Sequence, residues 1–224
     1  VMRTRKPRSD FDELGPERSR RLTHVSADAA EWIERVVRRR ASQAVLCTDP
    51  FHVVSWATDA LDAVRREVWN AARRAGETAL ARDLKGARFA LWKNPEDLTE
   101  RQRLKLAGIA RTNEPLYRAY LLKEQLRLVF AARGTAGIVS LDAWLGWASR
   151  CRIPAFVELA RKVARNRAGI EAALVHGLSN ARVEALNTRI RLLTRIAFGF
   201  RSPAALIALA MLTLGGFCPP LPGR

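Results

Sequence analysis

The acidic residues best suited to chemistry in this chain are Asp28, Asp49 and Glu184, which lie far apart in the sequence. Asp28 and Asp49 each follow a short apolar stretch, and Glu184 lies in a stretch rich in arginine. Carboxylates that converge in a basic surrounding are what a magnesium site for phosphodiester chemistry needs, because Mg²⁺ prefers hard oxygen ligands. On spacing alone, three ordinary polar residues at the ends of elements are the simpler interpretation.

Glu184 belongs to a segment, residues 179–197, that contains no helix breaker and begins with a suitable N-cap, Ser179. Apolar residues recur at steps of three and four on one face of this helix, and polar residues occupy another. The apolar stripe is Val183, Leu186, Ile190 and Leu193, and the polar face is Asn180, Glu184, Asn187 and Arg191. A lone acid on a basic helix is more often a solvated surface residue than a catalytic one.

The motif Asp49-Pro50-Phe51-His52 places an imidazole three residues after a carboxylate. This spacing fits a metal pair, but it also fits a histidine that caps a helix and hydrogen-bonds a neighbour, and the structural use is favoured. His24 and His176 have no partner at the spacing of metal ligands. The sequence contains no glycine-rich phosphate loop, nucleophile elbow or zinc-deaminase signature.

Charge is the strongest feature of the composition. The 224 residues include 39 Lys and Arg against 22 Asp and Glu, a net charge of +17, while 48% of the residues are hydrophobic. The chain can therefore bury a sizeable core, and its excess of arginine favours a polyanionic partner, with nucleic acid first. An anionic membrane surface is the rival, but no long helix has a basic face opposite an aromatic one.

The three cysteines, Cys47, Cys151 and Cys218, are isolated, which argues against a zinc site or a disulfide framework and favours a reducing cytoplasm. No signal peptide is visible, and the apolar run at residues 204–214 is too short to span a bilayer. We expect this run to be a buried helix, with Ser202 as its cap and Pro203 in its first turn.

The amino-terminal part of the sequence predicts a small α/β element. Residues 1–9 form a basic arm that we expect to be disordered. Residues 22–26 and 44–48 predict two strands, joined by a helix at residues 29–40 whose inward face includes Trp32. Strands joined in this way form a parallel pair, and ligand sites gather at the carboxyl ends of such strands. Asp28 and Asp49 both lie there.

From residue 55 to about residue 176 the pattern is helical, with segments near 55–82, 99–111, 114–133, 140–150, 154–166 and 168–176. Thr99 begins a capping box, and Asn113 and Ser140 are suitable caps for two further helices. Tryptophans are expected in the interior: Trp56, Trp69, Trp144 and Trp147. The predicted class is mostly α with a small α/β part, in which a helical block interrupts the core and the helices of residues 177–224 return to it.

Six strings in the sequence resemble the DDE transposases of bacterial insertion sequences, in particular the ISL3 family, which carries a long helical insertion. The strings are VSAD (25–28), DPFHVV (49–54), RFALWKN (88–94), LKEQLR (122–127), SNARVEALN (179–187) and AFGF (197–200). The resemblance covers about residues 10–216. It implies a partial ribonuclease-H-like core at residues 10–54, a helical insertion domain at 55–176, and returning core helices at 177–224.

The resemblance also implies roles for individual residues. Asp28 takes the place of the second catalytic Asp of the family and Glu184 that of the Glu, so both are implied catalytic residues and ligands of Mg²⁺ or Mn²⁺. Asp49 and His52 match the supporting Asp-x-x-His pair, and Asn180 and Asn187 would orient the Glu or contact DNA. The arginines implied to bind DNA are Arg182, Arg189, Arg191 and Arg195.

One departure from the family pattern concerns the first catalytic Asp, which lies on a strand well upstream of the second. Residues 1–9 cannot form such a strand. The resemblance therefore implies a transposase fragment that corresponds to the carboxyl-terminal part of the catalytic domain, with metal-dependent cleavage and strand transfer at transposon ends as the family activity. The alternative is a catalytically dead DNA-binding remnant; a helical RNA-binding module has no aromatic recognition motif behind it.

The partners expected on this basis are double-stranded transposon ends and target DNA, with a homodimer left open and no membrane association. The expected location is the bacterial cytoplasm, at the nucleoid.

Overall fold

The computed structural model describes residues 10–214, apart from the side chains of residues 10, 181–184 and 214. The predicted disordered arm, residues 1–9, lies outside the described residues. The chain divides into two compact units, residues 1–179 and residues 180–224. The described residues are mostly helical with one small parallel sheet, so the predicted class of a mostly α chain with a small α/β part is confirmed.

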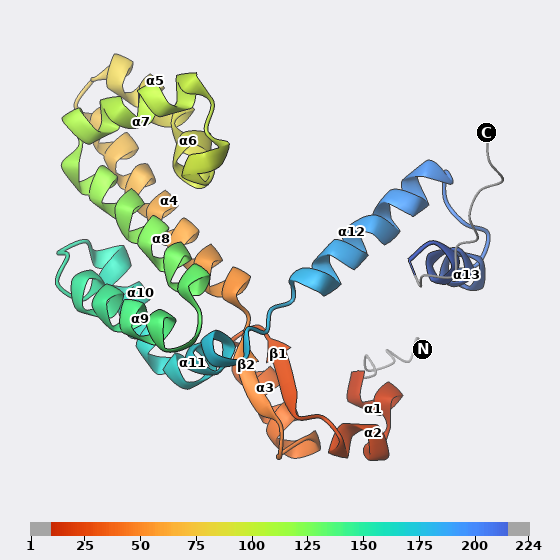
Figure 1. Cartoon of the computed structure of the whole chain (residues 1–224). Helices are drawn as coiled ribbons and strands as arrows, with labels where there is room; N and C mark the ends of the chain where they lie inside the picture. The colour runs from red at the N-terminus through yellow and green to blue at the C-terminus, as the bar shows by residue number, and fades with distance from the viewer. Residues whose placement is uncertain (1–9, 215–224) are drawn as a thin grey trace, which may run out of the picture. The chain divides into compact units, whose positions relative to one another are not determined.

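The α/β part comprises two short helices followed by a strand–helix–strand unit (Figure 1). Its elements are α1 (Asp10–Leu14), α2 (Pro16–Arg20), β1 (His24–Ala27), α3 (Glu31–Arg40) and β2 (Val45–Thr48). The two strands pair in parallel, with His24 opposite Val45 and Ala27 opposite Thr48. The predicted strands were correct to within two residues. The prediction that Trp32 faces inward was wrong, because its side chain is 63% exposed, whereas Val37 on the same helix is buried.

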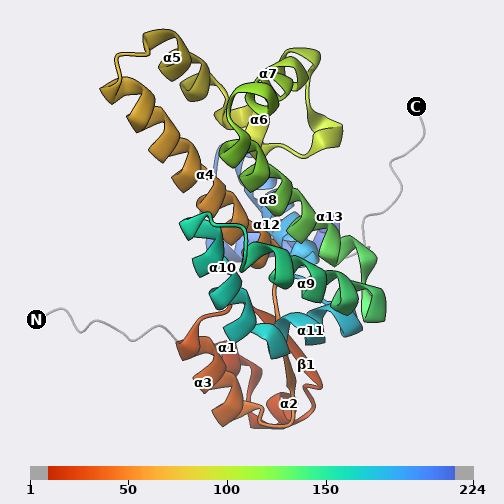
Figure 2. The ribbon, with the colours of Figure 1, turned by 90° about the vertical axis from the view of Figure 1, so that its left-hand side faces the viewer.

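The remainder of the first unit is a helical block of eight α-helices and one 3₁₀ turn within the described residues. Its elements are α4 (Pro50–Arg74), α5 (Thr78–Gly86), α6 (Arg88–Trp92), η1 (Pro95–Asp97), α7 (Glu100–Thr112), α8 (Glu114–Ala132), α9 (Gly134–Ala148), α10 (Pro154–Arg165) and α11 (Arg167–His176). The long helices α4 and α8 run side by side (Figures 1 and 2).

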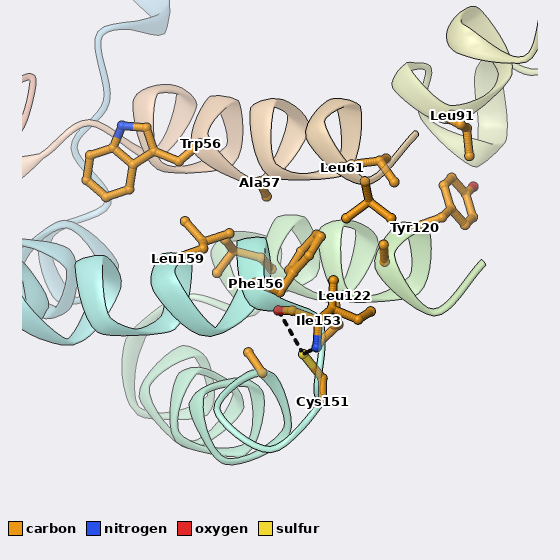
Figure 3. Close-up of a cluster of buried hydrophobic side chains, with 14 of the residues drawn as sticks. Trp56, Ala57, Leu61, Leu91, Tyr120, Leu122, Cys151, Ile153, Phe156 and Leu159 are labelled. Carbon is orange, nitrogen blue, oxygen red and sulfur yellow. Dashed lines mark hydrogen bonds between the residues drawn. The ribbon is translucent and has the colours of Figure 1, made fainter. Parts of the chain in front are cut away.

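The core of the block lies where α8 and α10 pack against α4. Ala57 and Leu61 of α4 point toward Phe156 of α10 and Leu122 of α8 (Figure 3), and all four side chains are buried. The indole of Trp144 is fully buried and donates a hydrogen bond of 2.8 Å to the carbonyl of Leu122, which satisfies its N–H group. Trp69 and Trp147 pack against this core while half-buried, so the expected interior placement of the tryptophans was largely correct.

Several helix boundaries test the cap predictions. Thr99 and Gln102 form the predicted capping box, and the Asn113 side chain accepts the N–H of Leu116 at 3.0 Å. The prediction that Ser140 is a cap was wrong, because α9 already begins at Gly134, after Arg133 adopts a positive φ of 49°. The predicted helix at residues 55–82 is in fact two helices, because the chain turns at Gly76, where φ is +76°.

A buried ammonium group connects α8 to the end of α6. Lys123 of α8 is 2% exposed, and its Nζ donates to the carbonyls of Leu91 and Lys93 at 3.0 and 3.4 Å. These carbonyls belong to the last turn of α6, where no intrahelical donor remains. Burial lowers the pKa of Lys123, and its contact with the Glu124 carboxylate opposes that shift. The ammonium therefore fixes the end of α6 against α8.

The helix α11 packs directly on β2 and closes one side of the small sheet. Its closest approach is at Gly169, where an added Cβ would lie 2.4 Å from Thr48 Oγ1 and 3.4 Å from the Thr48 backbone nitrogen. A side chain at this position fits only if the Thr48 hydroxyl moves or the helix shifts away from the strand. Although α11 lies within the range predicted for the insertion, it forms part of the support for the strand that ends before Asp49.

The contact between α11 and β2 leads to a prediction about stability. The substitution Gly169→Ala is expected to lower the free energy of unfolding by about 1–3 kcal/mol, since it overpacks a tight contact. Gly108→Ala on α7 is the matched control: nothing lies within 4 Å of the added Cβ, and helix propensity should raise stability by up to about 1 kcal/mol. Urea unfolding of the two variants measures both effects, and equal stability of the two would contradict the close contact.

The second unit contains α12 (Ala181–Ile196) and α13 (Pro203–Leu214). The N-cap of α12 is Asn180 rather than Ser179, whereas Ser202 caps α13 as predicted, its Oγ accepting the Ala205 N–H at 3.3 Å. The expected burial of α13 is not seen within this unit, where Ile207 stays 61% exposed. No helix within residues 10–214 is long and apolar enough to cross a membrane.

Candidate active site at the strand ends

The candidate site lies where β1 and β2 end side by side. Because Ala27 is opposite Thr48 in the parallel register, the next residues, Asp28 and Asp49, leave the sheet at the same edge. The Asp49 N–H donates to the Ala27 carbonyl at 2.9 Å, which extends the pairing by one step and holds the two turns together. The sequence-based prediction that both aspartates lie at neighbouring strand ends is therefore confirmed.

The first turn of α4 brings His52 to the same place. Pro50 occupies the first helical position, where its fixed φ favours a helix and its missing N–H costs nothing, so α4 starts immediately after Asp49. The imidazole Nδ1 of His52 lies 3.7 Å from Asp28 Oδ1, a distance that makes an ion pair when the imidazole is protonated. His52 therefore faces Asp28 on the neighbouring strand.

The two aspartates have different surroundings. The Asp49 side chain is buried, with 2% of the residue exposed, at the base of α4. The Asp28 side chain is 53% exposed and the His52 side chain 36% exposed, so both can meet a ligand from solvent. A cavity of about 370 Å³ opens beside Asp28, and Thr48, Glu34 and Arg165 also line it. Asp28 is thus the accessible carboxylate of the pair, and Asp49 the supporting one.

Cations from α10 border this region, and sequence reasoning did not single them out. Trp56 makes an edge-on contact with His52, with ring centroids 5.3 Å apart, and Lys162 Nζ lies 3.9 Å from the Trp56 ring. Burial lowers the pKa of Lys162, with Asp59 opposing that shift and Arg165 reinforcing it. With 39 Lys and Arg in the chain, sequence spacing alone could not distinguish these two cations from the rest.

The other predicted site residues lie in the second unit. Asn180 is the N-cap of α12, and the exposed side chains on that helix include Asn187, Arg189, Arg191 and Arg195. The side chains of Arg182 and Glu184 lie outside the described part of the chain. The structure thus brings together Asp28, Asp49 and His52, while the convergence of Glu184 with them stays a prediction.

Of the three cysteines, Cys47 and Cys151 lie in the described region, where both are buried and free. Cys218 lies outside the described residues. Among the described side chains, which do not include that of Glu184, His, Cys, Asp and Glu form no group of three or more that could hold a metal ion.

Comparison with known proteins settles the family. The family model for the ISL3 group of DDE transposases, described as "Transposase", matches residues 3–210. The chain belongs to this family. The transposase for insertion sequence element IS1557 of Mycobacterium tuberculosis is 60% identical over 96% of this chain and 52% of its own length. The transposase for insertion sequence element IS1001 of Bordetella parapertussis is 29% identical over 87% of this chain and 48% of its own.

The ISL3-family chain thus spans about half the length of the curated relatives it matches. No solved structure matches it. The resemblance stated from the motifs is confirmed at the level of the family.

Proposed function

We propose that this chain supplies part of the catalytic domain of a transposase that cleaves and joins DNA strands at transposon ends. The observation that carries the proposal is the arrangement of Asp28, Asp49 and His52 at the carboxyl ends of two parallel strands. These residues stand at the site edge expected for a parallel sheet and come from separate stretches of the chain. Membership of the transposase family supports the same reading.

In this proposal, β1, α3 and β2 are part of a ribonuclease-H-like core, residues 55–176 are its helical insertion, and residues 177–224 return to it. Glu184 on α12 would join Asp28 at the site. The return would bring the exposed arginines of α12 toward the DNA, where Arg189, Arg191 and Arg195 contact backbone phosphates. The working assembly would be located at the nucleoid, with a homodimer as the form that holds two transposon ends.

The donors present fit a hard divalent cation in part. Asp28 offers an accessible carboxylate, and hard oxygen ligands are those that Mg²⁺ and Mn²⁺ take. We propose that Asp28 and Glu184 hold the cation and that Asp49 supports the strand end from its buried position. A bound cation would stabilise the negative charge that develops on the attacking and leaving oxygens of the phosphodiester.

The residues of this chain have three further tasks in the reaction. Asp28 is kept at the strand end by the backbone hydrogen bond between Asp49 and Ala27. His52 lies next to Asp28, where it can orient the carboxylate. Lys162 and Arg165 place positive charge near the site and would offset the repulsion between the DNA backbone and the carboxylates. The attacking groups are water and then a DNA 3′-hydroxyl, in line with the leaving oxygen.

A second candidate function is DNA binding without cleavage. The observation that favours it is the net charge of +17 together with the exposed arginines of α12, which suit phosphate contacts whether or not a metal is held. In that case the basic helices would still hold duplex DNA through phosphate contacts, and the aspartates at the strand ends would serve only the fold.

Cleavage assays on two proteins separate these functions. The first protein is this chain alone, and the second is this chain joined to the other half of its 60% identical relative. On a plasmid that carries a transposon end, we expect background nicking by the chain alone and Mg²⁺-dependent nicking by the joined protein. Removal of the metal with EDTA should return the joined protein to background. A joined protein that binds DNA but does not nick it in Mg²⁺ or Mn²⁺ would favour binding without cleavage.

A further inference from the structure

The far end of the helical block contains a basic cavity that the proposed active site does not use. It lies between the last turns of α4 and the helix α5, has a volume of about 330 Å³, and is lined by Trp69, Arg73, Thr78, Arg82 and Lys85 together with two small residues. None of these lining residues, all of them in the described part of the chain, is acidic. Figure 1 shows α5 at the opposite end of α4 from β1 and β2.

The cations of this cavity are available to a ligand. In the described region, Arg73, Arg82 and Lys85 make no ion pair with a carboxylate, whereas Arg66 and Arg103 nearby are paired with Asp62 and Glu100. All three cavity cations are exposed. Arg82 and Lys85 are three residues apart on α5 and so lie on the same face of that helix.

Aromatic and neighbouring groups further define the cavity. The Arg73 guanidinium lies 4.9 Å from the centroid of the half-buried Trp69 ring, which restricts where the guanidinium can point. Outside the cavity lining, Lys105 of α7 lies beside the last residue of α5, with its Nζ 2.6 Å from where a Cβ on Gly86 would be. The cavity has several cations and no acid in its lining. Such a cavity suits a phosphate better than it suits a protein carboxylate or an apolar ligand.

The position of the cavity relative to the strand ends is set by α4, which starts at the proposed active site and ends at the cavity. His52 and Arg73 are 21 residues apart on this helix. At 1.5 Å per residue they are separated by roughly 32 Å along its axis. One turn of duplex DNA is about 34–36 Å. A duplex lying along α4 with one phosphodiester at the strand ends would therefore place a phosphate near the cavity one turn away.

We propose that this cavity binds a backbone phosphate of the DNA duplex, about one helical turn from the phosphodiester at the strand ends. The inference rests on the proposed function, because it takes DNA as the ligand of the whole chain. Arg73, Arg82 and Lys85 contact the phosphate, and the long helix α4 fixes the spacing between the two contacts. The helical block then sets the direction of the duplex on the protein.

The test compares two triple variants with the same loss of positive charge. The first is Arg73→Gln, Arg82→Gln and Lys85→Gln, and the control is Arg66→Gln, Arg103→Gln and Arg161→Gln, whose side chains are exposed and ion-paired. Binding of a labelled 30-base-pair duplex is measured by fluorescence anisotropy at several salt concentrations, after circular dichroism has shown equal helix content. Each lost phosphate contact should reduce the slope of log affinity against log salt by about 0.9.

For the cavity variant we expect a slope reduced by about 0.9, as for one lost phosphate contact, and at least a tenfold loss of affinity at low salt. The control should differ from the wild type by less than about threefold. The loss of affinity should also depend on length: it should be smaller for duplexes of about 8 base pairs, which are too short to contact the strand ends and the cavity together, than for the 30-base-pair duplex.

Three results would overturn the inference in distinguishable ways. If the wild type binds no duplex, the proposed function fails and the cavity proposal fails with it. If the wild type binds and both triple variants weaken equally, the effect is one of net charge and the cavity is not a site. If the cavity variant binds DNA normally but loses calorimetric binding of inorganic phosphate or pyrophosphate, the cavity holds a small anion and not the duplex.

Discussion

Between 50 and 200 mM salt, the affinity of this chain for duplex DNA is expected to fall by about 10³–10⁵-fold. The net charge of +17 and the exposed arginines of α12 provide enough cations for 6–10 phosphate contacts, and each contact releases condensed counterions from the DNA. The driving force is therefore the entropy gained when counterions are released into the solution. This gain becomes smaller as the salt concentration of the solution rises. Fluorescence anisotropy with a labelled duplex at four or more salt concentrations measures the slope.

The same measurement with two duplexes of unrelated sequence and equal length is the control. The two affinities and slopes should agree to within a few-fold, because contacts to phosphates carry no direct sequence information. An affinity that stays constant between 50 and 200 mM salt would contradict binding through the phosphates. A large difference between the two duplexes at equal salt would show contacts to bases that the arginines of α12 do not explain.

In the joined protein described above, Glu184→Gln and Asp28→Asn are each expected to reduce metal-dependent nicking by roughly 10³-fold. An amide has no charge with which to hold the cation, and the stabilisation that a metal gives to developing oxygen charge is several kcal/mol, at 1.36 kcal/mol per factor of ten in rate. DNA affinity should stay equal or rise, since each change removes a negative charge near the phosphates. Initial nicking rates at saturating DNA measure the effect.

The matched control is Asp83→Asn, an identical change of charge on the exposed face of α5, which should leave the nicking rate unchanged. Nicking that survives Glu184→Gln would remove Glu184 from the site. The geometry offers an independent test, because two carboxylates that hold the same cation, or a pair of cations about 4 Å apart, must converge. An experimental structure with the Glu184 carboxylate more than about 10 Å from Asp28 would contradict the assignment.

Short sequence patterns correctly predicted the features that depend on interactions between residues close together in the chain. The two strands, the position of Asp28 and Asp49 after them, and the capping box at Thr99 all depend on residues close together in the chain. Helix ends without a strong stop signal were predicted less well. Nothing in the sequence marks Arg133 as the residue with positive φ that allows α9 to start at Gly134, six residues before Ser140.

Contacts between segments that are far apart in the sequence could not be predicted from the spacing of apolar residues. The pairing of His52 with Asp28 follows from the strand register together with the abrupt start of α4, and the motif spacing had pointed to Asp49 as its neighbour. The position of Lys162 against Trp56 depends on how α10 packs on α4, which the pattern of either helix leaves undetermined. For Glu184, the resemblance of its motif to the family implied the role of a metal ligand. That role stays a prediction, because it depends on contacts between the two units.

The buried ammonium of Lys123 has a consequence for how the helical block moves. Because the buried ammonium of Lys123 on α8 holds two carbonyls at the end of α6, α6 cannot move away from α8 without breaking both hydrogen bonds. Amide protons of α6 should accordingly exchange with solvent only through openings that also involve α8, as one cooperative unit.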